Sequence, residues 1–367
     1  MSSPRAHRIV VIKGDGIGPE LVDAALLVLE AARQACGFRL EVDLREGGAG
    51  LYRKSGASLA PDTFEAIKQA DAAMKGPVGL PEVRLPDGTE AGLLGGVLRI
   101  GLDAYANLRP VRLLPGVDAA LKAKPGEIDY VIVRENTEGL YLSRGKGVGT
   151  SEAIADTLLV TRKGVERVAR YAFELARRRN RAKQVTCVDK ANVLASLAFF
   201  RRVFDEVGEA YPDVKREHLY ADAAAQALVL RPQSFDVLVM ENFLGDILSD
   251  LGGATVGGIG LCPSGNIGDR HAYFEPIHGS APDIAGQDKA NPISQVLSAA
   301  LMLDHLGERD AAALIRRAVD SALTERKLVL GRFGQPEGGT KRAAETLAAA
   351  VRSLLISAPS LPPYPSI

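Results

Sequence analysis

The sequence predicts an α/β fold, because short apolar runs alternate with longer segments of helical periodicity along the chain. A third observation supports this class: polar and charged residues directly follow several of the apolar runs. Open α/β sheets keep their active sites at the carboxyl ends of their strands, so these residues are the first candidates for a functional site. The predicted strands are Ile9–Ile12, Tyr130–Val133, Gln184–Val188 and Phe235–Met240.

Two segments have clear helical patterns. Pro19–Ala35 follows a Gly-rich turn. Lys163–Arg179 places Val165, Phe173 and other apolar residues on one stripe. Residues 141–161 lie between the strand Tyr130–Val133 and this second helix. They are rich in Gly and Ser at first and contain β-branched residues toward their end. This composition suits a protruding β-arm whose edges need a partner, and a plain surface loop is the alternative.

Composition excludes several classes of function. The chain has 367 residues, which is enough for two domains or for one large core with insertions. Its 45 basic and 45 acidic residues cancel, so a nucleic-acid partner is not expected. No apolar stretch is long enough for a membrane span or a signal peptide. The three scattered cysteines suit free thiols in a reducing compartment, and we expect a cytoplasmic protein. The Pro-rich end, residues 357–367, is expected to be a surface or disordered tail.

The segment that follows Phe235–Met240 carries two carboxylates at helical spacing. Asp246 and Asp250 are four residues apart, which places both on one face of a helix that begins near Glu241. Two carboxylates so close repel each other unless a cation lies between them. A hard divalent cation such as Mg²⁺ or Mn²⁺ is suited to that position, and a solvated helix edge is the alternative.

Three arginines are candidates for binding a carboxylate. Arg99 and Arg109 are ten residues apart, and Arg134 ends the strand Tyr130–Val133. If they converge, they can hold a substrate carboxylate by bidentate hydrogen bonds. Tyr141 follows Arg134 by seven residues, and Lys190 follows the strand Gln184–Val188.

Two Gly-rich or turn-rich segments suit a nucleotide. Lys13 to Glu20 contains GDGIGPE, which resembles a dinucleotide-binding turn but lacks the third Gly of GxGxxG. His278 to Pro292 is long, polar and rich in small residues, and an ordinary Ω-loop is the alternative. Asp283 within it could accept hydrogen bonds from a ribose 2′-hydroxyl and would repel a 2′-phosphate.

These motifs, in this order, resemble the β-decarboxylating dehydrogenase family, which includes isocitrate, 3-isopropylmalate, homoisocitrate, tartrate and D-malate dehydrogenases. The resemblance runs from about Val10 to about Gly307. The motifs that carry it are GDGIGPE at 14–20, LR at 98–99, NLRP at 107–110, RENTEGLY at 134–141, DKAN at 189–192, ENFLGDILSDL at 241–251, and HGSAPDIAG with ANP at 278–292.

The resemblance implies a two-domain fold around a twisted mixed sheet that differs from the Rossmann fold. Residues 1–104 and 257–367 would form a discontinuous cofactor-binding domain. Residues 105–256 would form the domain for dimerisation, metal and substrate, with the β-arm at about 141–161. The arm would interlock with that of a second copy. The resulting homodimer, or dimer of dimers, would have active sites to which Lys190 and Asp222 come from the neighbouring subunit.

The same resemblance implies a role for each site residue. Asp222, Asp246 and Asp250 would bind Mg²⁺ or Mn²⁺, which chelates the C1 carboxylate and C2 hydroxyl of the substrate. Lys190 would take the hydroxyl proton, hydride would pass to the cofactor, and Tyr141 would protonate C3 after CO₂ is lost. Arg99, Arg109 and Arg134 would hold the β-carboxylate that leaves.

The cofactor residues implied are Ile17 near the nicotinamide, and His278, Gly279, Ser280, Ala281, Asp283 and Asn291 around the adenosine. Asp283 followed by Ile284 resembles the NAD-dependent members, whereas bacterial NADP-dependent members look to carry Lys-Tyr there. We therefore predict NAD as the cofactor.

The residues before Arg99 point to a malate-type substrate. Isocitrate and homoisocitrate enzymes carry polar or basic residues there, and many isopropylmalate enzymes carry adjacent leucines. This chain has Leu93, Leu94, Gly95 and Gly96, and Leu93 and Leu94 could shift register to serve. No further cation is evident for a third carboxylate, which disfavours isocitrate and homoisocitrate.

The expected reaction is thus metal-dependent oxidative decarboxylation of 3-isopropylmalate, D-malate or tartrate. The alternatives are isocitrate or homoisocitrate as substrate, a regulatory subunit without turnover, and a metal-dependent hydrolase. The regulatory reading is disfavoured because all the implied catalytic groups are present. A hydrolase would leave HGSAPDIAG and the three arginines without a role.

Overall fold

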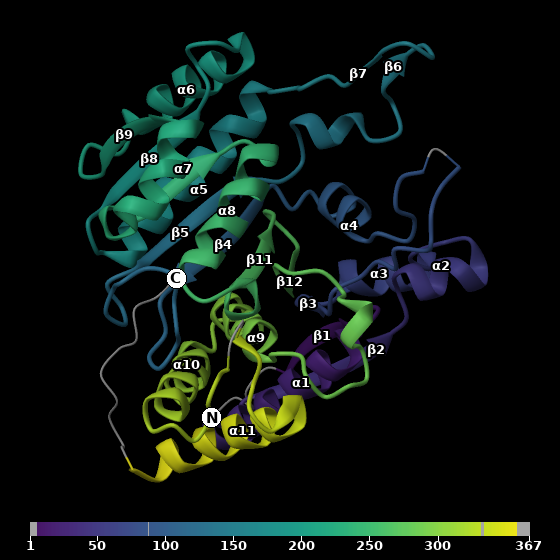
Figure 1. The fold of residues 1–367 in the computed structure, drawn as a ribbon, viewed down its shortest axis with the longest axis vertical. Helices are drawn as coiled ribbons and strands as arrows, with labels where there is room; N and C mark the ends of the chain where they lie inside the picture. Colours follow the sequence, from purple (N-terminus) through teal and green to yellow (C-terminus); the bar gives the residue numbers. More distant parts are fainter. Residues whose placement is uncertain (1–5, 87, 332–333, 358–367) are drawn as a thin grey trace.

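One ten-stranded mixed sheet organises the computed structural model, which describes residues 6–86, 88–331 and 334–357 (Figure 1). The predicted α/β class with a mixed, non-Rossmann sheet is confirmed. The predicted tail at 357–367 lies, from residue 358 onward, outside the described residues. In sheet order the strands are β2 (Arg39–Arg45), β1 (Ala6–Ile12), β3 (Ala72–Lys75), β12 (Ala272–Pro276), β11 (Pro263–Ile267), β4 (Ala106–Arg112), β5 (Asp129–Glu135), β10 (Val237–Met240), β8 (Gln184–Asp189) and β9 (Lys215–Tyr220).

The sheet consists of two parallel blocks joined by an antiparallel centre. The strands β2, β1, β3 and β12 are parallel to one another, and so are β5, β10, β8 and β9. β11 pairs antiparallel with both β12 and β4, and β4 pairs antiparallel with β5. The two blocks therefore run in opposite directions, and β11 and β4 join them at the centre of the sheet.

The predicted strands and helices are all present, with shifted ends. β1 begins at Ala6 instead of Ile9, because the three residues before Ile9 also pair with β2, where Ala6 lies opposite Arg39. Hydrophobicity marks burial, whereas a strand ends where its hydrogen bonding ends. The two predicted helices are α1 (Gly18–Cys36) and α5 (Arg162–Arg179). The other described helices of at least seven residues are α2 (Ala49–Ser55), α3 (Pro61–Gln69), α4 (Gly95–Gly101), α6 (Ala195–Gly208), α7 (Ala221–Leu230), α8 (Asn242–Thr255), α9 (Ile293–His305), α10 (Arg309–Thr324) and α11 (Gly339–Ser357).

Residues 141–161 form a small hairpin that projects from the body of the molecule (Figure 1). Its strands β6 (Val148–Gly149) and β7 (Ile154–Ala155) pair antiparallel. The apolar side chains of Val148 and Ile154 are 78% and 77% exposed. Such exposed strand edges carry unpaired backbone groups and apolar surface, which suits a segment that meets a partner.

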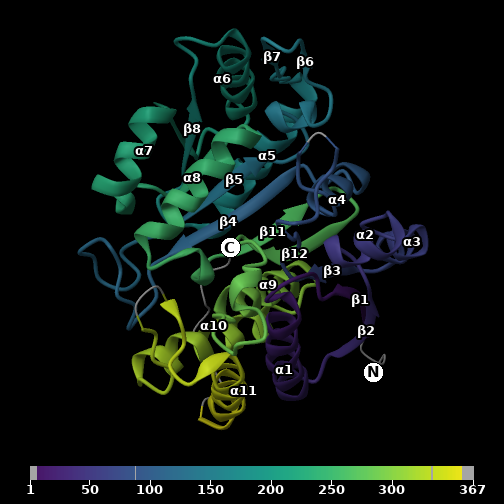
Figure 2. The same cartoon turned by 45° about the vertical axis from the view of Figure 1, so that its right-hand side comes forward.

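One face of the sheet is covered along its whole length. Alternate residues such as Val11, Met74, Leu108, Val133 and Val239 point to this face and are fully or almost fully buried. Helices α1, α5, α6, α9, α10 and α11 pack over them in one continuous core. Figure 2 shows α1, α9, α10 and α11 gathered below the sheet.

The opposite face is covered only at its two ends. Val10, Ile12 and Tyr273 pack with residues of α3 and α4 on one side, whereas Ile132 and Leu238 pack with α7 and α8 on the other. The residues of β12, β11, β4 and β5 that point into the gap between these clusters are polar, as described below. The fold thus leaves a polar space over the centre of the sheet.

The buried core predicts a loss of stability at alkaline pH. Burial, with the nearby Asp250 charge, raises the pKa of Cys262 to about 12, and burial beside Asp269 raises the pKa of Tyr105 to about 12. Both groups stay protonated in the folded chain but ionise in the unfolded chain above about pH 8.5 and 10. The contribution of these two groups to the free energy of unfolding should be fully present below about pH 8 and should be lost as pH rises toward 12. The loss should be about 1.4 kcal/mol per pH unit for each group that is ionised only in the unfolded chain.

Urea unfolding between pH 7.5 and 10.5 measures this fall. Cys262→Ala removes one of the buried thiols that ionise first in the unfolded chain, so its free energy of unfolding should decline less between about pH 8.5 and 10 than that of the unmodified chain. A free energy of unfolding that stays constant over the whole range would contradict this account of the core.

Candidate active site

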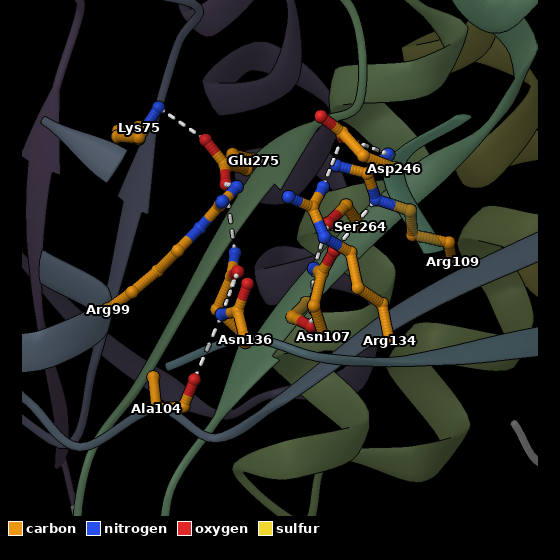
Figure 3. A network of polar contacts seen from close by, with 12 residues as sticks. Lys75, Arg99, Ala104, Asn107, Arg109, Arg134, Asn136, Asp246, Ser264 and Glu275 are labelled. Carbon is orange, nitrogen blue, oxygen red and sulfur yellow. Dashed lines mark hydrogen bonds and ion pairs between the residues drawn. The ribbon is translucent and has the colours of Figure 1, made fainter. Parts of the chain in front are cut away.

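A cavity of about 730 Å³ opens over the central strands, in the gap between α4 and α8. Arg99, Arg109 and Arg134, which the sequence analysis singled out, all line it, together with Tyr141 and Asp246. The structure therefore brings the three arginines together from α4, β4 and β5. Figure 3 shows Arg109 and Arg134 beside Asp246, with Arg99 across the cavity.

Two of these arginines are fixed by the strands and the helix around them. Arg109 donates from Nε to Asn107 (2.7 Å) and from Nη1 to Ser249 (2.6 Å). Arg134 donates from Nε and Nη2 to Asn242 Oδ1, at 3.0 and 2.7 Å. A Cβ atom on Gly245 would lie 2.5 Å from the Arg134 side chain, so the glycine is what lets this arginine pass α8. Both guanidinium groups are almost completely buried, yet keep further donors for a ligand.

Asp246 lies where these positive charges meet. Its carboxylate pairs with Arg134 and, at 3.3 Å, with Arg109. Burial on its own would raise the pKa of Asp246, but the charges of Arg134 and Arg109 outweigh it and lower the pKa. Burial and the neighbouring Arg109 and Arg99 charges lower the pKa of Arg134. Three arginines beside one half-buried carboxylate favour an added anion in this space.

Asp250 follows Asp246 by one helical turn on α8, as predicted. The helix begins where predicted because the Glu241 carboxylate caps it, accepting N–H bonds from Phe243 (2.9 Å) and Leu244 (2.7 Å). Asp250 lies 3.6 Å from Arg109, and burial raises the pKa of its carboxyl group. Two accessible carboxylates on one helix face, one of them reluctant to ionise alone, fit the oxygen ligands of a hard divalent cation.

One chain does not complete the predicted set of three aspartates. Within the described ranges, no group of three or more His, Cys, Asp or Glu side chains is placed to hold a metal ion. Asp222 instead accepts a hydrogen bond from Lys190 Nζ at 2.8 Å. This pair sits at the β8–β9 edge of the sheet, where Asp222 is largely exposed. The structure thus keeps Lys190 with Asp222 and separates both from Asp246 and Asp250.

Tyr141 reaches the cavity from the short 3₁₀ helix η1 (Leu140–Ser143). Its hydroxyl donates to Asp246 Oδ2 at 2.7 Å, and its ring packs edge-on against Phe243. The Arg134 guanidinium lies 5.6 Å from the ring centre. Burial, together with the hydrogen bond to Asp246 and its charge, raises the pKa of Tyr141 to about 12, so the hydroxyl carries its proton at neutral pH.

A second polar network, centred on Lys75 and Glu275, was missed by the sequence analysis. Lys75, at the end of β3, pairs with Glu275, which lies 3.9 Å from Arg99 (Figure 3). Burial on its own would raise the pKa of Glu275, but the charges of Lys75 and Arg99 lower it. The signal was available, because Lys75 is the last residue of a strand and Lys190 directly follows one.

The expectation that no further cation faces the site is wrong. Lys75 and Arg144 both line the cavity. Lys75 is paired with Glu275, whereas Arg144 donates to the backbone carbonyl of Glu90 and forms no ion pair with any residue of the described ranges. The objection to a third substrate carboxylate therefore does not hold on the ground of missing cations.

The wall before Arg99 is open. Leu94 is fully buried in the core and cannot reach a ligand, whereas Leu93 lines the cavity. Gly95 and Gly96 also line it, and a Cβ atom on Gly96 would meet nothing within 4 Å. The space beside Arg99 is thus bounded by bare backbone and by apolar side chains such as Leu93 and Ile100.

The two candidate nucleotide segments lie against each other. The Ile17 amide, in the turn between β1 and α1, donates to the Ser280 carbonyl at 2.8 Å. A Cβ atom on Gly16 would lie 2.0 Å from that same carbonyl, so the close approach requires glycine. Ile17 is buried in a small apolar cluster with Ala281 and Ile284, and Ala281 itself has a left-handed φ of 37°.

The loop after β12 leaves several polar groups open for a ligand. His278 lines the cavity and hydrogen bonds through Nδ1 to the Gly279 carbonyl, while its buried Nε2 has no partner within the described part of the chain. Gly279 and Asp283 are exposed. Asn291 instead donates to the Gly334 carbonyl at 2.7 Å and caps Ile293, so its amide already has protein partners. Gly279, Asp283 and the His278 ring are therefore the groups of this loop that remain for a ligand, whereas Asn291 is already engaged.

Comparisons with known proteins agree with this geometry. Residues 8–337 match the family model described as isocitrate/isopropylmalate dehydrogenase. The chain is 45% identical over 321 residues to the 3-isopropylmalate/3-methylmalate dehydrogenase of Methanocaldococcus jannaschii, covering 86% of this chain and 91% of that protein. It is 48% identical over 334 residues to the 3-isopropylmalate dehydrogenase of Thermobifida fusca, covering 88% and 93%.

Solved structures show the same architecture. The isocitrate dehydrogenase of Methylococcus capsulatus superposes with a TM-score of 0.85 at 39% identity, covering 94% of this chain and 99% of that one. A β-decarboxylating dehydrogenase of Thermococcus kodakarensis gives 0.79 at 38% identity, covering 95% and 97%. The names of these relatives refer to different substrates, so the similarity assigns the family and not the substrate of this chain.

Proposed function

The chain belongs to the isocitrate/isopropylmalate dehydrogenase family, and from that premise we propose that it uses NAD and a divalent cation to decarboxylate a 3-substituted malate oxidatively. The family resemblance drawn from the sequence is confirmed, and the chain is a decarboxylating dehydrogenase that acts on a hydroxy acid. One observation carries the finer proposal: Arg99, Arg109, Arg134, Tyr141 and Asp246 line one cavity.

The arginines are proposed to hold the carboxylate that leaves as CO₂. Arg109 and Arg134 are fixed on strands by Asn107 and Asn242, so their free N–H groups are pre-oriented and little freedom is lost on binding. Arg99 closes the site from the opposite wall. A dianionic substrate would also relieve the mutual repulsion of the three guanidinium groups.

Tyr141 is proposed as the general acid that protonates C3 after CO₂ departs. Its hydroxyl is protonated at neutral pH and lies 2.7 Å from Asp246 Oδ2, at the centre of the site. Lys190 is proposed to receive the proton of the C2 hydroxyl. Because Lys190 and Asp222 lie at the sheet edge, away from Asp246, they would serve the site of a second copy.

Asp246 and Asp250, with Asp222 of the second copy, would hold Mg²⁺ or Mn²⁺. When bound, such a cation supplies positive charge that acidifies a hydroxyl and stabilises a developing enolate. Asp246 would then exchange part of its pairing with Arg134 and Arg109 for the cation, freeing both arginines for the substrate.

Ile17, His278 to Ala281 and Asp283 are proposed to bind NAD, and Asn291 is proposed to complete this set by holding the loop. The exposed Asp283 carboxylate suits a ribose with free hydroxyls and would repel a 2′-phosphate. The buried Nε2 of His278 has no partner in the described residues and is the acceptor of the ring, because Nδ1 bonds to the Gly279 carbonyl.

We also propose a homodimer in which residues 105–256 form the shared interface and the remaining residues form the cofactor domain. Exposed apolar side chains gather on this part of the chain, including Val193, Leu230, Ile247, Val148 and Ile154. No helix in the described ranges is long and apolar enough to cross a membrane. We propose that the enzyme works in the cytoplasm.

Two classes of C3 substituent fit the open wall. Leu93, Ile100 and the bare Gly95–Gly96 backbone suit a small or apolar C3 substituent, as in D-malate, tartrate or 3-isopropylmalate, and the names of the relatives support 3-isopropylmalate. Arg144 and Lys75 favour a second class with a third carboxylate, such as isocitrate or homoisocitrate.

Initial rates of reduced-cofactor formation across these five substrates, with Mn²⁺ and with either NAD or NADP, would decide between them. We expect turnover with NAD, a higher kcat/KM for NAD than for NADP, and the highest kcat/KM for an apolar 3-substituted malate. A higher kcat/KM with NADP would overturn the proposal for Asp283. A preference for isocitrate or homoisocitrate would move the proposal to the second class.

A further inference from the structure

We infer that Arg201 is a positioning residue that holds Lys190 and Asp222 ready for the active site of a second copy of the chain. The inference rests on the proposed function, in which these two residues act across the dimer. It concerns a residue outside the cavity and without a place in the reaction described above. Four observations on α6, β8 and β9 support it.

The first observation is an ion pair that Arg201, itself 26% exposed, forms with a fully buried carboxylate at the end of β8. Arg201, from α6, donates from Nε and from Nη2 to the two carboxylate oxygens of Asp189, each at 2.8 Å. Asp189 is completely buried, and it directly precedes Lys190. A bidentate pair of this kind fixes both the position and the plane of the carboxylate.

The second observation is that the same carboxylate shapes the turn that carries Lys190. Asp189 Oδ1 also accepts the N–H of Ala191 at 2.8 Å. The amides of Val193 and Leu194 both donate to the Lys190 carbonyl at 3.0 Å. The turn is therefore tied to Asp189 at its beginning and closed on Lys190 itself, so its conformation depends on where Asp189 is held.

The third observation concerns Tyr220, which links this turn to Asp222. Asp189 and Tyr220 are partners in the parallel pairing of β8 and β9, so both strands end at the same level. The Arg201 guanidinium lies 5.0 Å from the centre of the Tyr220 ring, and Lys190 Nζ lies 5.8 Å from it. Two cations on one aromatic ring restrict where Lys190 can lie.

The fourth observation is that the assembled pair faces outward. Lys190 Nζ and Asp222 Oδ2 are 2.8 Å apart, but Asp222 is 71% exposed and Val193 beside the pair is 68% exposed. A surface ion pair is worth little stability, so stability alone does not explain a buried anchor behind it. An anchor of this kind is expected where geometry must be kept within a fraction of an ångström for a function.

Arg201→Met keeps the length and apolar packing of the side chain but removes the pair. We expect kcat to fall about 10- to 100-fold, as is typical when a residue that orients an active-site group is lost. The KM for the cofactor should be unchanged. Arg201→Lys keeps the positive charge but lacks the planar guanidinium group, so its kcat should lie between those of the unmodified enzyme and Arg201→Met. Thermal unfolding and dimer content of each variant show whether the fold is intact, and Arg201→Lys carries the test if Arg201→Met does not fold.

Hydrogen exchange of the ligand-free dimer gives a readout independent of turnover. In Arg201→Met the amides of residues 190–194 should exchange faster, while those of α7 and β10 stay unchanged. Lys190→Met removes the ammonium group but leaves the anchor, so its 190–194 amides should keep their protection. Unchanged exchange in Arg201→Met would overturn the inference.

Isolated heterodimers separate this inference from the proposed function. One subunit carries Asp246→Asn, and the other carries either Lys190→Met or Arg201→Met. If Lys190 acts across the dimer, each heterodimer has one complete site and should recover about half of the unmodified activity, although all three homodimers are weak. Recovery with both would support the inference.

Two other outcomes are decisive. Recovery with Lys190→Met but not with Arg201→Met would overturn the inference while leaving the shared site standing. Recovery with neither would overturn the shared site itself, and with it the inference.

Discussion

Asp246→Asn should lower kcat/KM by roughly 10³-fold or more, because it removes a proposed metal ligand. Loss of a residue that only hydrogen bonds to a metal ligand already lowers activity about 10- to 100-fold. The substitution keeps the size of the side chain and its hydrogen bond to Tyr141, whose distance is 2.7 Å in the structure. It removes the negative charge between Arg109 and Arg134, both almost fully buried. The dissociation constant for Mn²⁺ should rise in parallel.

Titration calorimetry with Mn²⁺ and steady-state kinetics at saturating Mn²⁺ measure the two effects. Asp213→Asn is a matched control, because Asp213 forms an exposed pair with Arg177 and does not line the cavity. This control should leave both the Mn²⁺ affinity and kcat near those of the unmodified enzyme. An unchanged Mn²⁺ dissociation constant in Asp246→Asn would remove Asp246 from the proposed ligand set.

Tyr141→Phe should slow the overall reaction by about 10²- to 10⁴-fold, the range expected when a general acid is lost. The ring and its edge-on contact with Phe243 remain, so the change is confined to the hydroxyl. Because the hydroxyl acts after hydride transfer in this proposal, protonation at C3 should suffer more than oxidation at C2. Reduction of the 2-oxo acid intermediate, supplied directly with NADH, should therefore survive better than the complete reaction.

Comparing the rates of NADH formation, CO₂ release and 2-oxo acid reduction in the same variant tests this order. Tyr52→Phe, in α2 and outside the cavity, serves as the control. The pKa of Tyr141 near 12 adds a pH expectation for the free enzyme: kcat/KM should show no loss from its deprotonation below about pH 10. Oxidation and CO₂ release at unmodified rates in Tyr141→Phe would show that another group is the acid.

Local patterns were sufficient for the elements that carry the site. The helix that bears Asp246 and Asp250 was predicted from their spacing and from its position after a buried strand, and it begins one residue after Glu241. The strands were located from apolar runs, but the start of β1 could not be, because Ala6, His7 and Arg8 do not form an apolar run and are held in the strand by pairing with β2. The pairing of two strands that are distant in the sequence cannot be predicted from the pattern of either strand alone.

The composition of the cavity shows the same limit. Arg99, Arg109 and Arg134 were each predicted as carboxylate-binding residues. Arg109 and Arg134 come together because β4 pairs with β5, and all three line the cavity beside α8. Lys75 and Glu275 are 200 residues apart and meet only because β3 and β12 are neighbours in the sheet. The sequence also gave no sign that Arg144 reaches the same cavity, since its position depends on the path of the loop after η1.

The most direct test of the central claim is the stoichiometry of NADH and CO₂ formed by the purified protein from its best substrate, with Mn²⁺ and again after chelation. The proposed chemistry predicts one CO₂ for each NADH, and loss of both products together when the cation is removed. NADH formed without CO₂, or turnover that persists fully in the presence of a chelator, would contradict it.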